Sequence, residues 1–353
     1  MKSISLRGNQ SAAFAVVLAA ALCAAIPVVA ASYTTVVLTA DQAGVGAFTD
    51  ANLRNAWGIS YSSTGDFWIS DNNNGLSTLY DGTGKPQALV VTIPAAAAGK
   101  KGTPTGTVFN SSTDFKVSNL PSVFLFVTED GTISGWDGVG TVAIVAVNNS
   151  AEAANYKGAE IANNGTGNFL YVANFFAGTI DVFDKNFKAT TLAGAFHDPN
   201  LLAGYAPFNI RAISGSLYVT YAKQNAAKTD AVNCAGCGFV DKYDLNGNFI
   251  KRFITQGKLN APWGITLAPA SFGTFSKDLL VGNLGDGHIN AFNATSGAFL
   301  GQLAASTGKA ITINGLWALK FGNGGSAGKT TELFYSAGPT AYAHGQLGKI
   351  TAQ

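Results

Sequence analysis

Composition limits the classes of protein to which this chain can belong. Its 353 residues are 47% hydrophobic and 12% charged, include 42 glycines and carry a formal net charge of +2. This near-neutral balance, with no run of basic residues, argues against nucleic acid or an anionic membrane as the principal partner. Few charges and many glycines, β-branched and aromatic residues instead favour an all-β protein with mostly buried strands.

Residues 1–31 have the composition of a secretory signal peptide. Lys2 and Arg7 form a basic start, an apolar run extends from Ala12 to Val29, and small residues at 28–31 offer a cleavage site. A retained anchor is the alternative, because the apolar run approaches the length of a membrane span. The many alanines and the missing basic flank favour cleavage. We therefore expect a secreted, periplasmic or extracellular protein, with no membrane span after cleavage and a folded domain at 32–353.

Six variants of one pattern follow along the chain. Each has an apolar strand, a polar corner, a glycine and a second alternating strand, and the clearest copy is LVGNLGDGHINAFNATSG at 280–297. The corner glycines stand about 47 to 60 residues apart, at Gly75, Gly131, Gly178, Gly238, Gly287 and Gly345. A repeat of this length built of strands and turns is typical of a β-propeller with one blade per repeat.

An innermost strand opens each repeat, so the sequence predicts six blades. These strands are expected at 55–61, 104–110, 156–162, 207–213, 262–268 and 314–321. Their glycines are expected near the crowded axis, where a missing side chain lets blades approach. The segment Tyr33–Ala40 stands alone before the first repeat, while the last repeat lacks room for a fourth strand. We predict that this N-terminal strand completes the final blade and closes the ring.

Cys234 and Cys237 lie in an insertion at 222–238 with the spacing CAGC. In an exported protein this spacing favours a disulfide that pins a surface loop. A thioredoxin-like redox pair would need a strand-to-helix context, and the chain shows almost no helical periodicity. A zinc site would need a second pair of ligands, which is not visible nearby.

Several phrases together resemble one known family. These phrases include NAWGIS at 55–60, TEDGTISGW at 128–136, LLVGNLGDGHINAF at 279–292 and ITINGLWALKFGNG at 311–324. They are similar to uncharacterised, exported, NHL-like six-bladed β-propeller proteins, mostly bacterial, some of which carry a PEP-CTERM sorting tail. The resemblance covers roughly residues 33–350. It implies a fold and an export route but no established reaction.

Calcium is the cofactor that the corners of the repeats suggest. Gluconolactonase-like six-bladed propellers hold a divalent cation at the channel mouth with oxygen ligands from several blades, and this chain offers oxygen ligands at equivalent strand-end corners. The candidate ligands here are Asp71, Glu129, Asp130, Asn174 and Asn283, and the candidate base is His344. The stretch before His344 lacks the acidic residues that often stand there in the family. The alternative is that Asp and Asn simply stabilise tight turns by bonding to their own backbone.

Other chemical signals are weaker. Trp57, Trp263 and Trp317 recur in the inner strands, either as core or as a platform for a sugar or another flat ligand. Residues 324–328 match G-x-S-x-G, but a nucleophile elbow needs a strand running into a helix. A quinone- or copper-dependent oxidoreductase would need a cluster of histidines, and the three histidines lie in separate repeats.

Two functional hypotheses follow. The first is a secreted, monomeric, rigid propeller that binds an extracellular ligand or protein through one face, without established catalysis. The second is a divalent-metal-dependent hydrolase of the lactonase or esterase kind at the channel mouth, which would use the corner carboxylates and His344.

Overall fold

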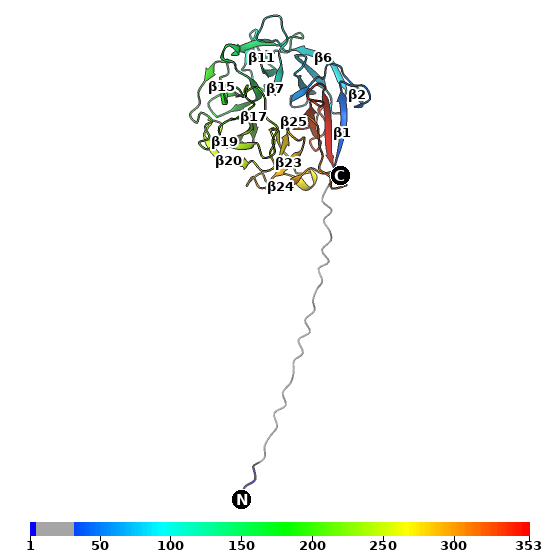
Figure 1. Ribbon diagram of the computed structural model, residues 1–353, viewed down its shortest axis with the longest axis vertical. Coiled ribbons are helices and arrows are strands. Elements are labelled where there is room, and N and C mark those ends of the chain that lie inside the picture. Colours follow the sequence, from blue (N-terminus) through cyan, green and yellow to red (C-terminus); the bar gives the residue numbers. More distant parts are fainter. Residues whose placement is uncertain (5–31) are drawn as a thin grey trace. The chain divides into compact units, whose positions relative to one another are not determined.

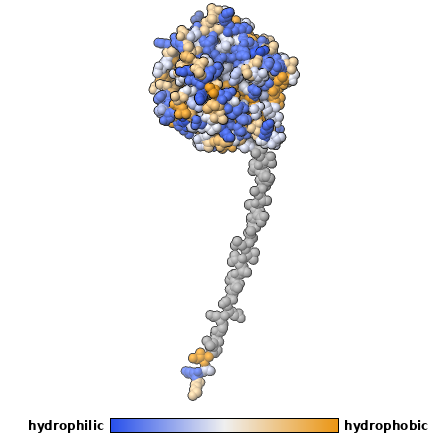
Figure 2. Space-filling model, viewed as in Figure 1, coloured by the Kyte–Doolittle hydropathy of each residue, from blue (hydrophilic) through white to orange (hydrophobic). Residues whose placement is uncertain are grey.

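The computed structural model describes residues 1–4 and 32–353. The predicted signal peptide falls mainly on residues 5–31, which lie outside the described residues, so its cleavage stays a prediction. Residues 32–353 form six sheets arranged around a central axis, and the chain passes from one sheet to the next around the ring (Figure 1). Figure 2 shows a face on which hydrophilic residues predominate and hydrophobic patches are small and scattered.

Each of the first five blades is an antiparallel sheet of four strands in the order inner to outer. Blade 1 has β3 (Ala56–Ser60), β4 (Phe67–Asp71), β5 (Leu76–Tyr80) and β6 (Pro86–Thr92). Blade 2 has β7 (Pro104–Phe109), β10 (Phe124–Thr128), β11 (Thr132–Trp136) and β12 (Ile144–Asn148). Blade 3 has β13 (Tyr156–Asn163), β14 (Asn168–Asn174), β15 (Thr179–Phe183) and β16 (Ala189–Thr190).

The remaining blades repeat this order. Blade 4 has β17 (Tyr205–Ile213), β18 (Ser216–Lys223), β19 (Phe239–Tyr243) and β20 (Phe249–Thr255). Blade 5 has β21 (Pro262–Leu267), β22 (Leu279–Asn283), β23 (Ile289–Phe292) and β24 (Phe299–Gln302). Blade 6 has β25 (Leu316–Phe321), β26 (Leu333–Ala337) and β27 (Gln346–Ala352), and it is completed by β1 (Tyr33–Ala40) and β2 (Phe48–Thr49). A small hairpin of β8 (Lys116–Val117) and β9 (Leu120–Pro121) stands outside the blades.

The N-terminal strand closes the ring, as predicted. β1 pairs antiparallel with β27, from Tyr33 opposite Ala352 to Ala40 opposite Gln346. In Figure 1 the blue first strand accordingly lies beside the red last strands. Tyr33 is buried and its hydroxyl donates to the Phe272 carbonyl at 3.1 Å, which ties the closing strand to blade 5.

Inner strands pack closely because small residues face their neighbours. A Cβ at Gly58 would lie 2.4 Å from the Thr105 carbonyl oxygen of the next blade, and one at Gly264 would lie 2.7 Å from that of Trp317. Real side chains cannot come so close, so the predicted role of these glycines at the axis is confirmed. Middle strands such as β4 and β10 are wholly buried, whereas the outermost β12 is half exposed.

A β-bulge near the start of every inner strand determines what faces the axis. The register between the first and second strands shifts, for example, between Ala56 and Ile59 and between Tyr156 and Ala159. Corresponding shifts occur in the other four blades. A bulge releases residues from the ladder and re-aims their side chains. Four of the released residues line the site described next, namely Trp57, Lys157, Phe208 and Trp317.

Candidate functional site

A cavity of about 350 Å³ opens at the end of the channel where the inner strands begin. All six blades contribute to it, through the released inner-strand residues and the loops beside them. Its lining comprises Asn55, Trp57, Asn72, Asn73, Glu129, Lys157, Phe208, Asp230, Ala231, Leu284, Trp317, Ala341 and Tyr342. Its size falls within the range of about 300–1,000 Å³ that is usual for small-molecule sites.

Two stacked tryptophans form the floor of this channel-mouth cavity. The rings of Trp57 and Trp317 lie 3.5 Å apart at an interplanar angle of 16°. Trp263 packs edge-on against both, with centroids 6.4 and 6.2 Å away, and Phe208 packs edge-on against Trp317. All belong to one buried cluster. Both predicted roles of the tryptophans are therefore present: all three are core residues, and Trp57 and Trp317 also line the cavity.

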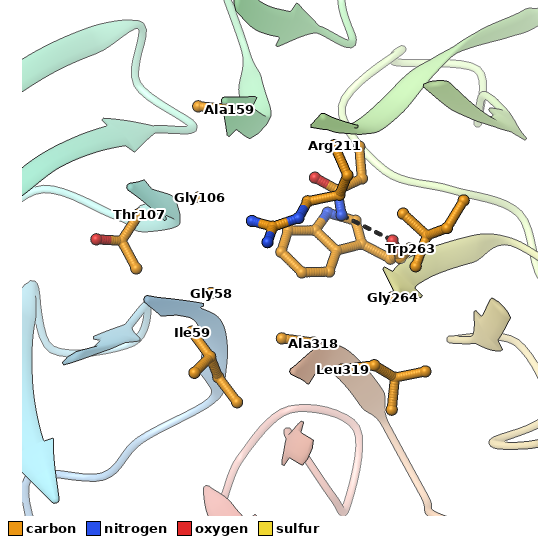
Figure 3. Close-up of a pocket in the computed structure, with 12 residues that line it drawn as sticks. Gly58, Ile59, Gly106, Thr107, Ala159, Arg211, Trp263, Gly264, Ala318 and Leu319 are labelled. Carbon is orange, nitrogen blue, oxygen red and sulfur yellow. Dashed lines mark hydrogen bonds between the residues drawn. The ribbon is translucent and has the colours of Figure 1, made fainter. Parts of the chain in front are cut away.

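Below this floor the channel is almost closed. Figure 3 shows the inner strands converging on a space lined by Arg211, Thr107 and Trp263, among others. The Asn209 amide donates to the Trp263 carbonyl at 2.8 Å across adjacent blades, which is the dashed line in Figure 3. The space measures about 20 Å³, room for roughly one water molecule. A ligand entering the channel-mouth cavity therefore meets a solid base.

A buried ion pair stands in the wall of the cavity. The side chain of Lys157 is wholly buried, and its ammonium forms an ion pair with the carboxylate of Glu129. Its Nζ atom also lies 3.8 Å from Oδ1 of Asp230 and 5.1 Å from the ring centroid of Trp57. A buried ammonium is costly unless it is paired, so these carboxylates and the ring face allow Lys157 to occupy this place.

A hydrogen-bonded chain links the ion pair to the tryptophan floor. Trp317 Nε1 donates to Asn55 Oδ1 at 2.9 Å, and Asn55 Nδ2 donates to Asn72 Oδ1 at 3.1 Å. Asn72 Nδ2 in turn donates to Glu129 Oε2 at 2.9 Å. Each polar group fixes the orientation of the next, so the wall is preorganised for polar contacts.

The rim is formed by two loops. Asp230 and Ala231 come from the insertion between β18 and β19, and Tyr342 comes from the loop between β26 and β27. Burial, and to a smaller extent the carboxylate of Asp230, raise the pKa of the Tyr342 phenol, so that it stays protonated and can donate at neutral pH. The insertion also contains the Cys234–Cys237 disulfide, which confirms that prediction.

Two of the predicted metal ligands, Asp71 and Asp130, do not line the cavity and form hydrogen bonds elsewhere. Asp71 is fully buried at the end of β4, and its Oδ2 accepts a hydrogen bond from Thr78 Oγ1 at 2.8 Å. Burial raises the pKa of Asp71 well above its ordinary value. Asp130 Oδ2 accepts from the Ala96 backbone N–H at 2.6 Å. Asp71 thus bonds to a side chain of the neighbouring strand and Asp130 to the connection between β6 and β7, rather than each to the backbone of its own turn.

The two asparagines behave in the same way. Asn174 Nδ2 donates to Asp181 Oδ2 at 2.9 Å, and Asn283 Nδ2 donates to the Lys258 carbonyl at 2.8 Å. Of the five predicted ligands only Glu129 lines the cavity. Within residues 1–4 and 32–353 no three His, Cys, Asp or Glu residues are grouped closely enough to hold a metal ion. The donor set also fits calcium poorly, because an ammonium already neutralises Glu129 and calcium takes about 6–8 oxygen ligands.

His344, the predicted base, lies outside the lining of the cavity. Its Nδ1 is 2.9 Å from Oδ2 of the buried Asp41, which also lies 3.4 Å from Arg54 Nε. The Asn55 backbone N–H donates to the His344 carbonyl at 3.1 Å. His344 thus joins the end of the closing strand to the loop that precedes the first inner strand.

Sequence reasoning missed Lys157, Asn55, Asn72 and Asp230. A signal for Lys157 was available, since it precedes a glycine at the inner-strand position that Trp57 occupies in blade 1. A lysine in that otherwise uncharged register is unusual for a buried site. Nothing comparable marks the asparagines, whose residue type suits any turn.

No helix in the described part of the chain has the length and apolarity needed to cross a bilayer.

No protein-family model matches the chain. Sequence relatives do exist in Acanthamoeba polyphaga mimivirus. The uncharacterized protein L690 is 31% identical over 319 residues, covering 87% of this chain and 82% of the relative. The uncharacterized protein R648 is also 31% identical, over 79% of this chain and 71% of its own length.

Solved structures share the fold at low identity. An aldose sugar dehydrogenase from Escherichia coli has a TM-score of 0.58 and 10% identity over 91% of this chain and all of that chain. The calcium-binding protein regucalcin from Agrobacterium tumefaciens has a TM-score of 0.51 and 11% identity over 85% and 91%. Such identities support the propeller fold alone.

The viral relatives do not bear on the bacterial origin, export and sorting tail that the resemblance implied, which stay predictions. They do show the family to which the chain is related. At this identity and coverage, the chain belongs to the family of the uncharacterised mimivirus proteins L690 and R648.

Proposed function

We propose that this protein binds a neutral, hydroxyl-rich ligand of the carbohydrate class in the channel-mouth cavity. The observation that carries the proposal is the pairing of an apolar floor, formed by Trp57 and Trp317, with a wall of oriented amide and carboxylate groups. Sugar rings have apolar faces that pack on aromatic rings and hydroxyls that both donate and accept hydrogen bonds. A concave site with few, fixed polar groups suits such a ligand.

The charges of the wall favour a neutral ligand. A cationic ligand would compete with Lys157, whose ammonium already occupies Glu129 and lies near the face of Trp57. An anionic ligand would approach the carboxylates of Glu129 and Asp230, which flank the ammonium. Either net charge would be bound at a cost in electrostatic free energy.

We also propose that the protein works outside the cytoplasm. The Cys234–Cys237 disulfide supports this location, because disulfides persist in oxidising compartments. The composition of residues 1–31 points the same way.

Calorimetry with a panel of neutral monosaccharides and oligosaccharides tests the binding proposal. Asn73 is exposed at the cavity, and its replacement, Asn73→Ala, should weaken binding by about tenfold through loss of polar contacts. Asn186→Ala, in the exposed turn between β15 and β16, is the matched control and should bind like the wild type. Absence of binding by every saccharide would overturn the proposal.

The metal-dependent hydrolase is the second candidate. Glu129 and Asp230 supply carboxylates at the cavity, and the fold is shared with a protein described as calcium-binding regucalcin. Lys157 counts against it, since its ammonium takes the place in which a cation would meet Glu129. Calorimetric titration with calcium distinguishes this candidate from the first. Saturable heat at one site per chain, with a rise in melting temperature, would favour the hydrolase and justify assays with lactones and esters.

A further inference from the structure

A second cavity lies beside the first on the same face of the ring. It measures about 420 Å³ and shares Leu284, Ala341 and Tyr342 with the channel-mouth cavity. Its other walls are the turn between β22 and β23, including Asp286, and residues of the connection that leads to β25. We call it the lateral cavity. Its volume also falls in the range usual for ligand sites, about 300–1,000 Å³.

Tyr342 is held at the boundary between the two cavities. Its backbone has φ +68°, and the two preceding residues, Thr340 and Ala341, also have positive φ. Each such non-glycine residue costs about 1 kcal/mol or more, so surrounding contacts must maintain this turn. The Asn73 amide donates to the Tyr342 carbonyl at 2.6 Å, and the Tyr342 ring lies 5.5 Å from that of Trp317. Strain of this kind is commonly retained at ligand clamps.

The lateral cavity offers polar groups, as the first one does, but its lining contains neither tryptophan nor the buried ion pair. Asn233, Thr312 and Asn314 offer neutral polar groups, and no lysine or arginine is among its described lining residues. Its one carboxylate, Asp286, accepts hydrogen bonds from the His288 backbone N–H at 3.0 Å and from Asn283 Nδ2 at 3.1 Å. Its aromatic side chain is Tyr342, which it shares with the channel-mouth cavity. Two adjoining cavities that share an aromatic side chain and both offer polar groups suit one ligand with repeated units.

We propose that the two cavities form one groove for a neutral oligosaccharide, with one unit in each cavity and Tyr342 at the junction between them. This inference rests on the proposed function and extends it from a single sugar to a chain. A ligand that spans both cavities gains the second set of contacts without a second loss of translational freedom. Affinity should therefore rise with chain length and then reach a plateau.

The test measures affinity against chain length. Calorimetry with gluco-, manno- and N-acetylglucosamine oligosaccharides of one to four units should show at least a tenfold gain between one and two or three units. Thr312→Trp should fill the lateral cavity from an exposed position, so the affinity for the tetrasaccharide falls to the level of the monosaccharide. Thr295→Trp, in the turn at the opposite end of blade 5, is the matched control and should keep the gain.

Each outcome separates the two proposals. Binding of saccharides with no gain from chain length, or a gain that survives in Thr312→Trp, overturns the groove but leaves the single-sugar site. Absence of binding by every saccharide overturns both. If Thr312→Trp does not fold, as judged by its melting curve, Asn314→Trp blocks the same cavity from another exposed position.

Discussion

The two ends of the central channel bury lysines in contrasting ways. At the channel mouth, Lys157 is wholly enclosed and neutralised by Glu129. At the far end of the inner strands, Lys320 Nζ lies 4.6 Å from the ring centroid of Tyr61. Burial, followed by repulsion from Arg211, lowers the pKa of Lys320 to about 7, although Glu160 partly offsets the shift. The lysine at the mouth is therefore held in an ion pair, whereas the pKa of the lysine at the far end lies near neutral pH.

This contrast explains which end can serve as a binding site. The wall at the mouth joins an ion pair to a chain of hydrogen bonds and offers oriented donors and acceptors. The far end leads only to a space of about 20 Å³. Its lysine is partly buried beside an almost solid core.

The largest expected effect breaks the ion pair at the mouth. Glu129→Gln leaves the Lys157 ammonium buried opposite a neutral amide, so the free energy of unfolding should fall by about 3 kcal/mol. The control is Glu160→Gln, which affects the more exposed Glu160–Arg211 pair, at 3.3 Å, and should cost no more than about 1 kcal/mol. Urea denaturation measures both. Equal losses would erase the distinction between the two ends.

A second effect concerns pH at the far end. Because the folded-state pKa of Lys320 is near 7 and that of an unfolded lysine is about 10.4, the unfolded chain binds more protons between these values. Stability should therefore rise with pH across this window, and Lys320→Met should remove part of the rise. Thermal melting of both proteins at pH 7, 8.5 and 10 measures the difference. Parallel curves would show that Lys320 keeps its ordinary pKa.

The smallest effect concerns the rim of the channel mouth. Replacing both Cys234 and Cys237 by serine removes a very short covalent loop, so the loss of stability should not exceed about 2 kcal/mol. The same insertion holds Asp230 against Lys157, so saccharide affinity should fall slightly. Calorimetry and denaturation of the double variant check both. A complete loss of binding would mean that the insertion, rather than the aromatic floor, forms the principal contact.

The fold could be predicted from the sequence, because each repeat carries its own signals. The corner glycines, the alternating strands and the solitary segment Tyr33–Ala40 each reflect local geometry, and together they specify six blades and the closing strand. The Cys234–Cys237 pair was equally local. These features could be predicted within one repeat, without knowing how neighbouring blades pack.

The candidate site could not be predicted in this way. Glu129 lines the cavity and Asp71 does not, although both stand at corners of the repeats, and the positions of Lys157 and Trp57 beside the cavity depend on bulges that shift the register by one residue. Such a shift changes the face on which a side chain lies. The hydrogen-bonded chain from Trp317 to Glu129 joins three blades, and spacing along one repeat contains no sign of it.

The closing strand has a consequence for the order in which the protein can be made. Tyr33 pairs with Ala352, so the first strand of the domain stays without its partner until nearly the whole chain has been synthesised. Contacts between distant parts of a chain form slowly, and unpaired strand edges invite association with other chains. Ring closure is therefore expected as the last step of folding. Until β27 has been synthesised, β1 and β26 therefore each carry an unpaired edge, and an incomplete chain should associate with other chains more readily than the closed ring does.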